Sequence, residues 1–323
     1  MSNSIVANDI GMPKSASGQP TANDDIPLAV DLDGTLVMTD TLYEGVIDSL
    51  KARPRRVFRV RGSLEGGKAA FKRRVARQIT IDPSLLPYNL DLLAYLRAAK
   101  LAGRKIGLFT AADQSIADSV AAHLGIFDVV RGSDGAVNLG GPAKVEAIRQ
   151  AFGPRFAYAG DAPVDVPIFE AAESVILVGP VDRLRTTLPP GKRVEATFPI
   201  KVDGRVWVKA LRLPHWVKNA LVFVAPILGI QGMSLRIASE ALLLFVLMGV
   251  LASATYIVND LLDLAADRQH PKKRFRPFAA GAISIRSGVT VAALMICGSF
   301  VVAACGSERT IWPLAFPRWS LCG

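Results

Sequence analysis

A long uncharged apolar run is the feature of this sequence that most constrains its fold. Residues 241–258 ("ALLLFVLMGVLASATYIV") contain no charged side chain, and the apolar stretch begins near residue 237. Because about 20 apolar residues suffice to cross the hydrocarbon core of a bilayer, this run predicts a transmembrane helix. Shorter apolar segments at 220–235 and 288–305 are further candidates, so we expect about three membrane helices.

The rest of the chain divides by composition. Residues 1–25 are polar and lack the basic start and apolar core of a signal peptide, so they predict a disordered tail. The segment 307–323 resembles neither a further helix nor a regular loop, and we interpret it as an aberrant tail of a truncated product. The remaining divisions that we predict are a soluble domain at 26–200, a basic interfacial linker at 201–218 and a membrane domain at 219–306.

Between residues 26 and 180, short apolar runs alternate with helical patterns. The apolar runs are 26–40, 104–113, 155–161 and 174–179. This alternation is typical of a doubly wound α/β domain, in which helices cover both faces of a parallel sheet. Ligands of such sheets bind beyond the carboxyl ends of the strands.

Polar side chains follow these apolar runs where the predicted strands end. Asp31 and Asp33, two residues apart, project in the same direction from an extended chain. One carboxylate could therefore attack phosphorus while the other transfers a proton. Asp161 could join the first on Mg²⁺. Thr110 and Lys144 could bind the oxygens of a transferring phosphoryl group.

The motifs "DLDGT", "FTAAD", "GPAK" and "GDAPVD" resemble, in that order, those of the haloacid dehalogenase-like phosphatases, over residues 27–180. The resemblance implies that Asp31 is the nucleophile and that Asp33 is the general acid and base. It implies that Thr110 and Lys144 hold the phosphoryl group. It also implies a helical cap at about 42–90. The residues expected around Mg²⁺ are Asp31, Asp33, Asp161 and Asp165.

The predicted cap is strongly basic, in a chain of formal net charge +10. Residues 51–77 contain 11 Lys and Arg against one acid, Glu65. They could be a solvated helix face, or they could attract anionic lipid or a phosphorylated substrate. Few aromatic residues interleave with the charges, so we do not expect nucleic acid as a partner. The three cysteines have neither zinc-site spacing nor the pattern of a disulfide framework.

The stretch 259–277 ("NDLLDLAADRQHPKKRFRP") follows the long apolar run directly. Asn259, Asp263 and Asp267 are spaced i, i+4, i+8, so a continuing helix would place them on one face. Clustered carboxylates repel unless a cation lies between them, which indicates Mg²⁺ bound to a phosphate or diphosphate. The cations that follow, from Arg268 to Arg276, could receive phosphate oxygens, or they could form a patch for anionic lipid.

This pattern resembles the UbiA superfamily of intramembrane prenyltransferases, whose first acidic motif is NxxxDxxxD. Together with "LRLPHWVKNALVF" upstream, it is similar to a branch that transfers phosphoribose from a pyrophosphate donor to a polyprenyl phosphate, over residues 206–305. The family uses more helices and a second Asp-rich motif, so we expect the transferase half to be inactive in this chain. The residues that the resemblance assigns to substrate are Arg212, Lys218, Asp260, Lys272, Lys273, Arg274 and Arg276.

Basic residues flank the predicted membrane segments unevenly. Nine Lys and Arg lie in 183–218 and six in 259–286, whereas the short connection between the first two segments carries Arg236. By the positive-inside rule, the soluble domain and the 259–286 loop both face the cytoplasm, in a membrane of the bacterial inner-membrane type.

Taken together, the sequence predicts a membrane-bound UbiA-type protein with a cytoplasmic, Mg²⁺-dependent phosphatase domain. Its expected partners are membrane lipid and a polyprenyl phosphate, a polyprenyl diphosphate or a phosphosugar. Two alternatives remain open at this point: a membrane-anchored phosphatase for a soluble phosphate ester, and a non-catalytic lipid-binding scaffold.

Overall fold

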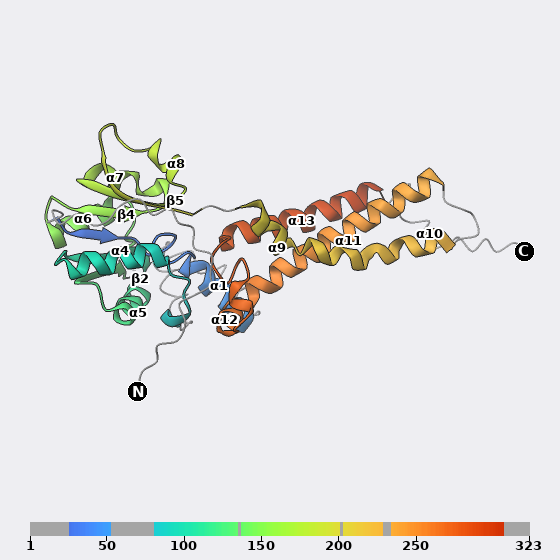
Figure 1. Ribbon diagram of the computed structural model, residues 1–323, viewed down its shortest axis with the longest axis horizontal. Helices are drawn as coiled ribbons and strands as arrows, with labels where there is room; N and C mark the ends of the chain where they lie inside the picture. The colour runs from blue at the N-terminus through green and yellow to red at the C-terminus, as the bar shows by residue number, and fades with distance from the viewer. Residues whose placement is uncertain (1–25, 53–80, 135–136, 201–202, 229–233, 307–323) are drawn as a thin grey trace, which may run out of the picture.

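The computed structural model describes residues 26–52, 81–134, 137–200, 203–228 and 234–306. An α/β part lies at one end of the molecule and an elongated helical part extends from it (Figure 1). Helix α1 (Thr41–Ala52) lies where the two parts meet, beside α12 (Leu264–Gln269).

The α/β part is built on six parallel strands in the order β3-β2-β1-β4-β5-β6. The chain moves outward from β1 in both directions, so the carboxyl ends of β1 and β4 form a topological switch point. Ligands of doubly wound sheets bind at such points. The strands are β1 (Leu28–Val30), β2 (Ile106–Asp113), β3 (Val129–Ser133), β4 (Ala157–Gly160), β5 (Ser174–Gly179) and β6 (Arg193–Pro199).

Helices cover both faces of the sheet, because alternate strand residues point to opposite faces. On one face Leu28 and Val30 of β1 pack with α4 (Leu90–Leu101) and α5 (Gln114–Leu124). On the other face Ala29 belongs to a cluster with α6 (Pro142–Phe152), α7 (Val166–Ala171) and α8 (Val181–Arg185). The doubly wound α/β domain expected from the sequence is therefore confirmed.

Four strands coincide with the apolar runs that predicted them, namely β1, β2, β4 and β5. The edge strands β3 and β6 were not predicted. Their sequences, "VVRGS" and "RVEATFP", contain charged or small residues, because an edge strand is covered less completely than a central one.

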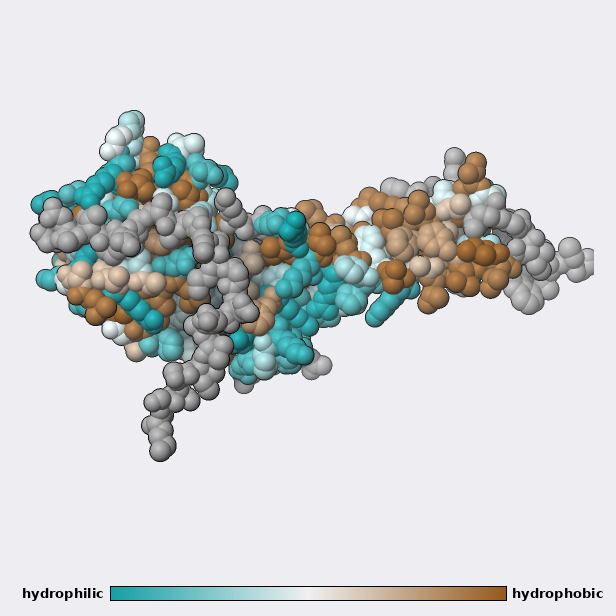
Figure 2. Space-filling view, in the orientation of Figure 1, coloured by the Kyte–Doolittle hydropathy of each residue, from teal (hydrophilic) through white to brown (hydrophobic). Residues whose placement is uncertain are grey.

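The helical part contains two helices long and apolar enough to cross a membrane, α11 (Leu235–Leu262) and α13 (Ile285–Gly306). Their surface is largely apolar in Figure 2, in contrast to the α/β part. The third predicted segment, 220–235, begins in η4 (Leu213–Phe223) and α10 (Val224–Leu228) and runs into 229–233, outside the described residues, so it stays a prediction. Shorter elements precede and connect the long helices: α9 (Gly204–Leu211), α12 and η5 (Lys273–Phe275).

A buried ion pair joins the two halves of the sheet. Arg104 donates to both carboxylate oxygens of Glu195, at 2.8 and 3.1 Å, and both side chains are almost fully buried. Glu195 also accepts from Ser174 and Tyr95. Although burial by itself raises the pKa of Glu195, the hydrogen bonds from Arg104 and Ser174 lower it overall. The carboxylate thus stays ionised in the folded protein.

We predict that Arg104→Met destabilises the α/β part by about 3–5 kcal/mol, because it leaves Glu195 buried without its countercharge. Lys100→Met is the matched control: it removes a half-exposed ion pair with Asp128 and costs at most about 1 kcal/mol. Hydrogen exchange of peptides from β2 and β6 measures the loss locally. Equal protection in the two variants would contradict the prediction.

Candidate functional site

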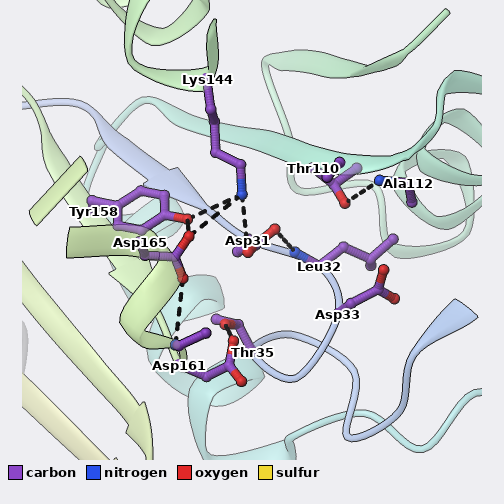
Figure 3. A network of polar contacts seen from close by, with 12 residues as sticks. Asp31, Leu32, Asp33, Thr35, Thr110, Ala112, Lys144, Tyr158, Asp161 and Asp165 are labelled. Carbon is purple, nitrogen blue, oxygen red and sulfur yellow. Dashed lines mark hydrogen bonds and ion pairs between the residues drawn. The ribbon is translucent and has the colours of Figure 1, made fainter. Parts of the chain in front are cut away.

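The polar residues predicted at the strand ends meet at one edge of the sheet (Figure 3). Asp31 follows β1, Asp161 follows β4, and Asp165 ends the short helix η3 (Pro163–Asp165). One carboxylate oxygen from each of these three residues lies within 4.8 Å of the others. Thr110, on β2, is buried beside them, and its Oγ1 accepts a hydrogen bond from Ala112 N.

Lys144 supplies a positive charge to this group. It lies in the first turn of α6, is 3% exposed, and its Nζ is 3.0 Å from Asp31 Oδ2 and 3.8 Å from Asp165 Oδ1. Burial alone lowers the pKa of Lys144, but the charges of Asp31 and Asp165 outweigh burial and raise the pKa above its ordinary value. Lys144 is therefore a fixed cation beside the expected nucleophile.

Tyr158 completes the network and was not predicted from the sequence. Its hydroxyl accepts from Lys144 Nζ at 3.2 Å and donates to Asp165 Oδ1 at 3.1 Å. Burial raises the pKa of Tyr158 well above its ordinary value, so the hydroxyl keeps the proton that it donates. A tyrosine within an apolar strand reads as a core residue, and no local signal distinguishes this one.

The three carboxylates fit a divalent cation. Burial and the charges of Asp31 and Asp165 raise the pKa of Asp161 to about 7. Burial and the charge of Asp31 raise the pKa of Asp165 to about 6. Crowded acids whose pKa values rise in this way gain most from a cation between them, and oxygen ligands are those that Mg²⁺ prefers.

The carboxylate of Asp33 lies outside this group of three, so its predicted role as a metal ligand stays a prediction. Its Oδ1 accepts from Thr41 N at 2.9 Å, at the start of α1, and Thr41 Oγ1 is 3.3 Å from its Oδ2. Burial and the charges of Asp40 and Asp31 raise the pKa of Asp33 to about 8, so the carboxyl is suited to donate a proton near neutral pH.

Gly34 allows a tight turn of the chain directly after Asp33, close to the side chain of Asp161. Its φ is 77°, and a Cβ on it would lie 2.3 Å from Asp161 Oδ2. Thr35 Oγ1 donates to Asp161 Oδ1 at 3.1 Å from the same turn. The turn after β1 thus positions the carboxylate that follows β4.

The predicted acidic motif lies at the junction of α11 and α12. Helix α11 ends at Leu262, and Asp263 has φ −103° and ψ 15°, so one regular helix does not carry the motif. Asn259 is exposed, Asp263 pairs with Lys51 at 2.8 Å, and Asp267 is buried. Among the described residues, Asp263 and Asp267 belong to no group in which three carboxylates approach within 4.8 Å.

Several cations predicted to bind substrate are already paired within the protein. Arg212 is 2.7 Å from Asp260, and Arg276 is 3.1 Å from Asp260 and 2.7 Å from Asp267. Arg268 is buried against Glu44 instead of facing a phosphate. Lys218, Lys272, Lys273 and Arg274 are exposed.

Other predicted features fall outside this geometry. His270, which lies among the cations from Arg268 to Arg276, stabilises a turn, because its Nδ1 accepts hydrogen bonds from the backbone N–H groups of Lys272 and Lys273. Most of the basic patch 51–77 lies outside the described residues, as do the tails 1–25 and 307–323. The proposed functions of these segments stay predictions.

Comparison with known proteins identifies the helical part. Residues 220–318 match the model of the UbiA prenyltransferase family, a range that includes part of the segment 307–323 set apart above. The C-terminal part of the chain carries a UbiA-family domain. Decaprenyl-phosphate phosphoribosyltransferase of Mycobacterium tuberculosis is 44% identical over 92 residues, which are 27% of this chain and 30% of that protein.

A longer match spans both parts. The uncharacterised protein y4nM of Sinorhizobium fredii is 39% identical over 273 residues, 84% of this chain and 53% of that protein. The chain spans about half the length of this relative, and the match is too long to fit within either part alone. A solved phosphoserine phosphatase, in a phospho-aspartyl intermediate analogue form, aligns with 53% of this chain and 93% of its own, with 16% identity and a TM-score of 0.36.

We predict that Gly34→Ala weakens Mg²⁺ binding by about 10–100-fold, because the new Cβ displaces Asp161. Gly103→Ala is the matched control, since Gly103 also has positive φ (89°) but no atom within 4 Å of the new Cβ. Isothermal titration calorimetry of both variants measures the affinity. Equal affinities would show that Asp161 is not a ligand.

We also predict that affinity for Mg²⁺ falls as the pH is lowered from about 8 to about 6. Protons compete with the metal for Asp161 and Asp165, whose pKa values are raised to about 7 and 6. Calorimetry at pH 6.5 in buffers of different ionisation enthalpy should detect proton release on binding. A heat of binding that is independent of the buffer would contradict this.

Proposed function

We propose that the α/β part is a phosphatase that hydrolyses a phosphate monoester carried by a lipid-linked sugar. The observation that carries the proposal is the Asp31–Lys144 contact at 3.0 Å, beside Asp33, whose pKa is raised to about 8. A nucleophilic carboxylate, a phosphate-holding cation and a proton donor are the three groups that an aspartyl-phosphate mechanism needs.

The chemistry of the proposed reaction has two steps. An oxygen of Asp31 bonds to phosphorus as the bond from phosphorus to the leaving oxygen breaks, and Asp33 gives its proton to that oxygen. Asp33 then takes a proton from water, whose oxygen bonds to phosphorus as the bond to Asp31 breaks. Lys144 neutralises charge on the phosphoryl oxygens throughout. A Mg²⁺ ion held by Asp31, Asp161 and Asp165 would add positive charge at the same phosphoryl group.

The UbiA-family domain supports a lipid-linked substrate. A phosphoribosyltransferase acting on a polyprenyl phosphate would give a product that retains the phosphate of phosphoribose as a monoester. A phosphatase in the same chain, packed against the membrane part, is well placed to remove it. On this proposal both parts face the cytoplasm, consistent with the positive charge around them. Whether this chain or a longer form performs the transfer does not alter the proposed hydrolysis.

We predict that full-length protein in detergent with Mg²⁺ releases phosphate from phosphoribosyl decaprenyl phosphate. Asp31→Asn should reduce turnover by at least about 10³-fold, because it removes the nucleophile. Asp118→Asn, an exposed carboxylate on α5, is the control and should leave turnover unchanged.

Ribose 5-phosphate separates the proposal from its soluble-ester alternative. A lower kcat/KM for ribose 5-phosphate than for the lipid supports the lipid-linked substrate. Equal or higher values for the soluble ester would favour a membrane-anchored phosphatase of a soluble ester. Absence of metal-dependent phosphate release from either ester would overturn the phosphatase assignment.

A further inference from the structure

Helix α1 belongs to the α/β part by sequence but packs against the helical part. Ile47 lies in a buried apolar cluster with Ile257 and Leu261 of α11, Leu264 of α12 and Ile285 of α13. Tyr43 packs against the same cluster, and the Arg286 guanidinium lies 4.8 Å from the centre of its ring. The position of α1 is therefore set by residues that follow the sheet by more than 50 positions.

One buried ion pair anchors α1 to α12. Arg268 donates to both oxygens of Glu44, at 2.6 and 2.9 Å, although the two residues are 224 positions apart. Their side chains are 7% and 9% exposed. Arg268 Nε also donates to Ala279 O at 3.1 Å, and Thr39 Oγ1 donates to Glu44 at 2.5 Å. Bidentate pairs of this kind fix geometry as well as charge.

The neighbouring contacts between the two parts are a weaker ion pair and a close steric contact. Lys51 pairs with Asp263 at the far end of α1, with both side chains about half exposed, and such pairs contribute little. Gly281, in the loop before α13, has φ 71° and lies so close to the α/β part that a Cβ on it would be 2.6 Å from Met38 O. The segment immediately before α1 is thus held against the loop before α13.

The same helix orients Asp33. Thr41, the first residue of α1, gives Asp33 two hydrogen bonds, one from its backbone N–H and one from its hydroxyl. Thr41 lies three residues before Glu44, on the same turn of α1. A shift of α1 therefore moves the donors that hold the Asp33 carboxyl.

We infer that Arg268, in the UbiA-family domain, is a positioning residue of the phosphatase site: it holds Glu44 and α1, and through Thr41 it fixes the direction of the Asp33 carboxyl. This inference rests on the proposed function, in which Asp33 gives a proton to the leaving oxygen. The membrane part thereby completes the phosphatase site instead of serving only as its anchor.

The inference has a specific kinetic signature. An alkoxide leaving group needs the proton from Asp33, whereas a dinitrophenolate leaves without one. A misdirected Asp33 thus slows the step in which Asp31 displaces an alcohol from an alkyl phosphate, but spares the step in which it displaces dinitrophenolate. The later attack of water on the aspartyl-phosphate slows equally for both esters, so the first step has to be measured by itself. General destabilisation of the protein would instead lower the first-step rate for both esters together.

The test uses full-length Arg268→Met in detergent with Mg²⁺, assayed on phosphoribosyl decaprenyl phosphate and on 2,4-dinitrophenyl phosphate. We expect the single-turnover rate of cleavage of the lipid ester to fall by about 10²-fold, and the rate of the dinitrophenolate burst to fall less than about threefold. Lys100→Met, which removes a partly exposed ion pair with Asp128 outside the junction, is the control and should change neither.

Two further variants keep the test decisive if Arg268→Met folds poorly. Glu44→Gln with Arg268→Met removes both buried charges. Gly281→Ala instead disturbs the neighbouring contact with Met38, just before α1, without changing any charge. Each should give the same selective loss. Equal losses in the single-turnover cleavage rate of both esters, or no loss on either, would overturn the inference and leave the phosphatase proposal intact. Wild-type protein that hydrolyses neither ester would overturn both.

Discussion

Crowding of carboxylates at one edge of the sheet is the constraint on which the rest of the site depends. Asp31, Asp161 and Asp165 approach one another within 4.8 Å, and each repels the others. Lys144 lies 3.0 Å from Asp31 and offsets part of that repulsion, and Tyr158 holds the ammonium and Asp165 in register. Burying these charges without partners inside the protein would cost several kcal/mol per ion, so the carboxylates depend on Lys144 and Tyr158 to stay buried.

This group was predictable because sheet topology brings it together. The carboxyl ends of parallel strands meet at one edge, so Asp31 and Asp161 converge from segments 130 positions apart in the sequence. Tyr158 and the strands β3 and β6 were not predictable in the same way. A buried tyrosine hydroxyl looks like any core aromatic in sequence, and edge strands lack the continuous apolar run that marks central ones.

The acidic motif shows what spacing alone leaves out. Periodicity placed Asn259, Asp263 and Asp267 on one helical face, and hydrogen bonds from Asp263 N to Asn259 O and from Asp267 N to Asp263 O keep that spacing although α11 ends at Leu262 and α12 begins at Leu264. Asp263 pairs with Lys51 from the distant α1. Partners more than 200 residues away leave no local pattern, so neither this pair nor the pair of Glu44 and Arg268 could be read from the sequence.

The contacts between α1 and the helical part make the two parts of the chain depend on each other. Glu44 and Arg268 are each less than a tenth exposed, so separating the parts would expose an apolar cluster and leave both charges without their partners. Two parts that share such a buried pair of charges pack against each other in the folded protein and are not simply joined by a linker. Because Thr41, at the start of the same helix, donates hydrogen bonds to Asp33, the position of this proposed proton donor depends on both parts of the chain. An isolated α/β domain would keep the carboxylates around Lys144, and α1 itself, but would lose the contacts with the helical part that hold α1 in place.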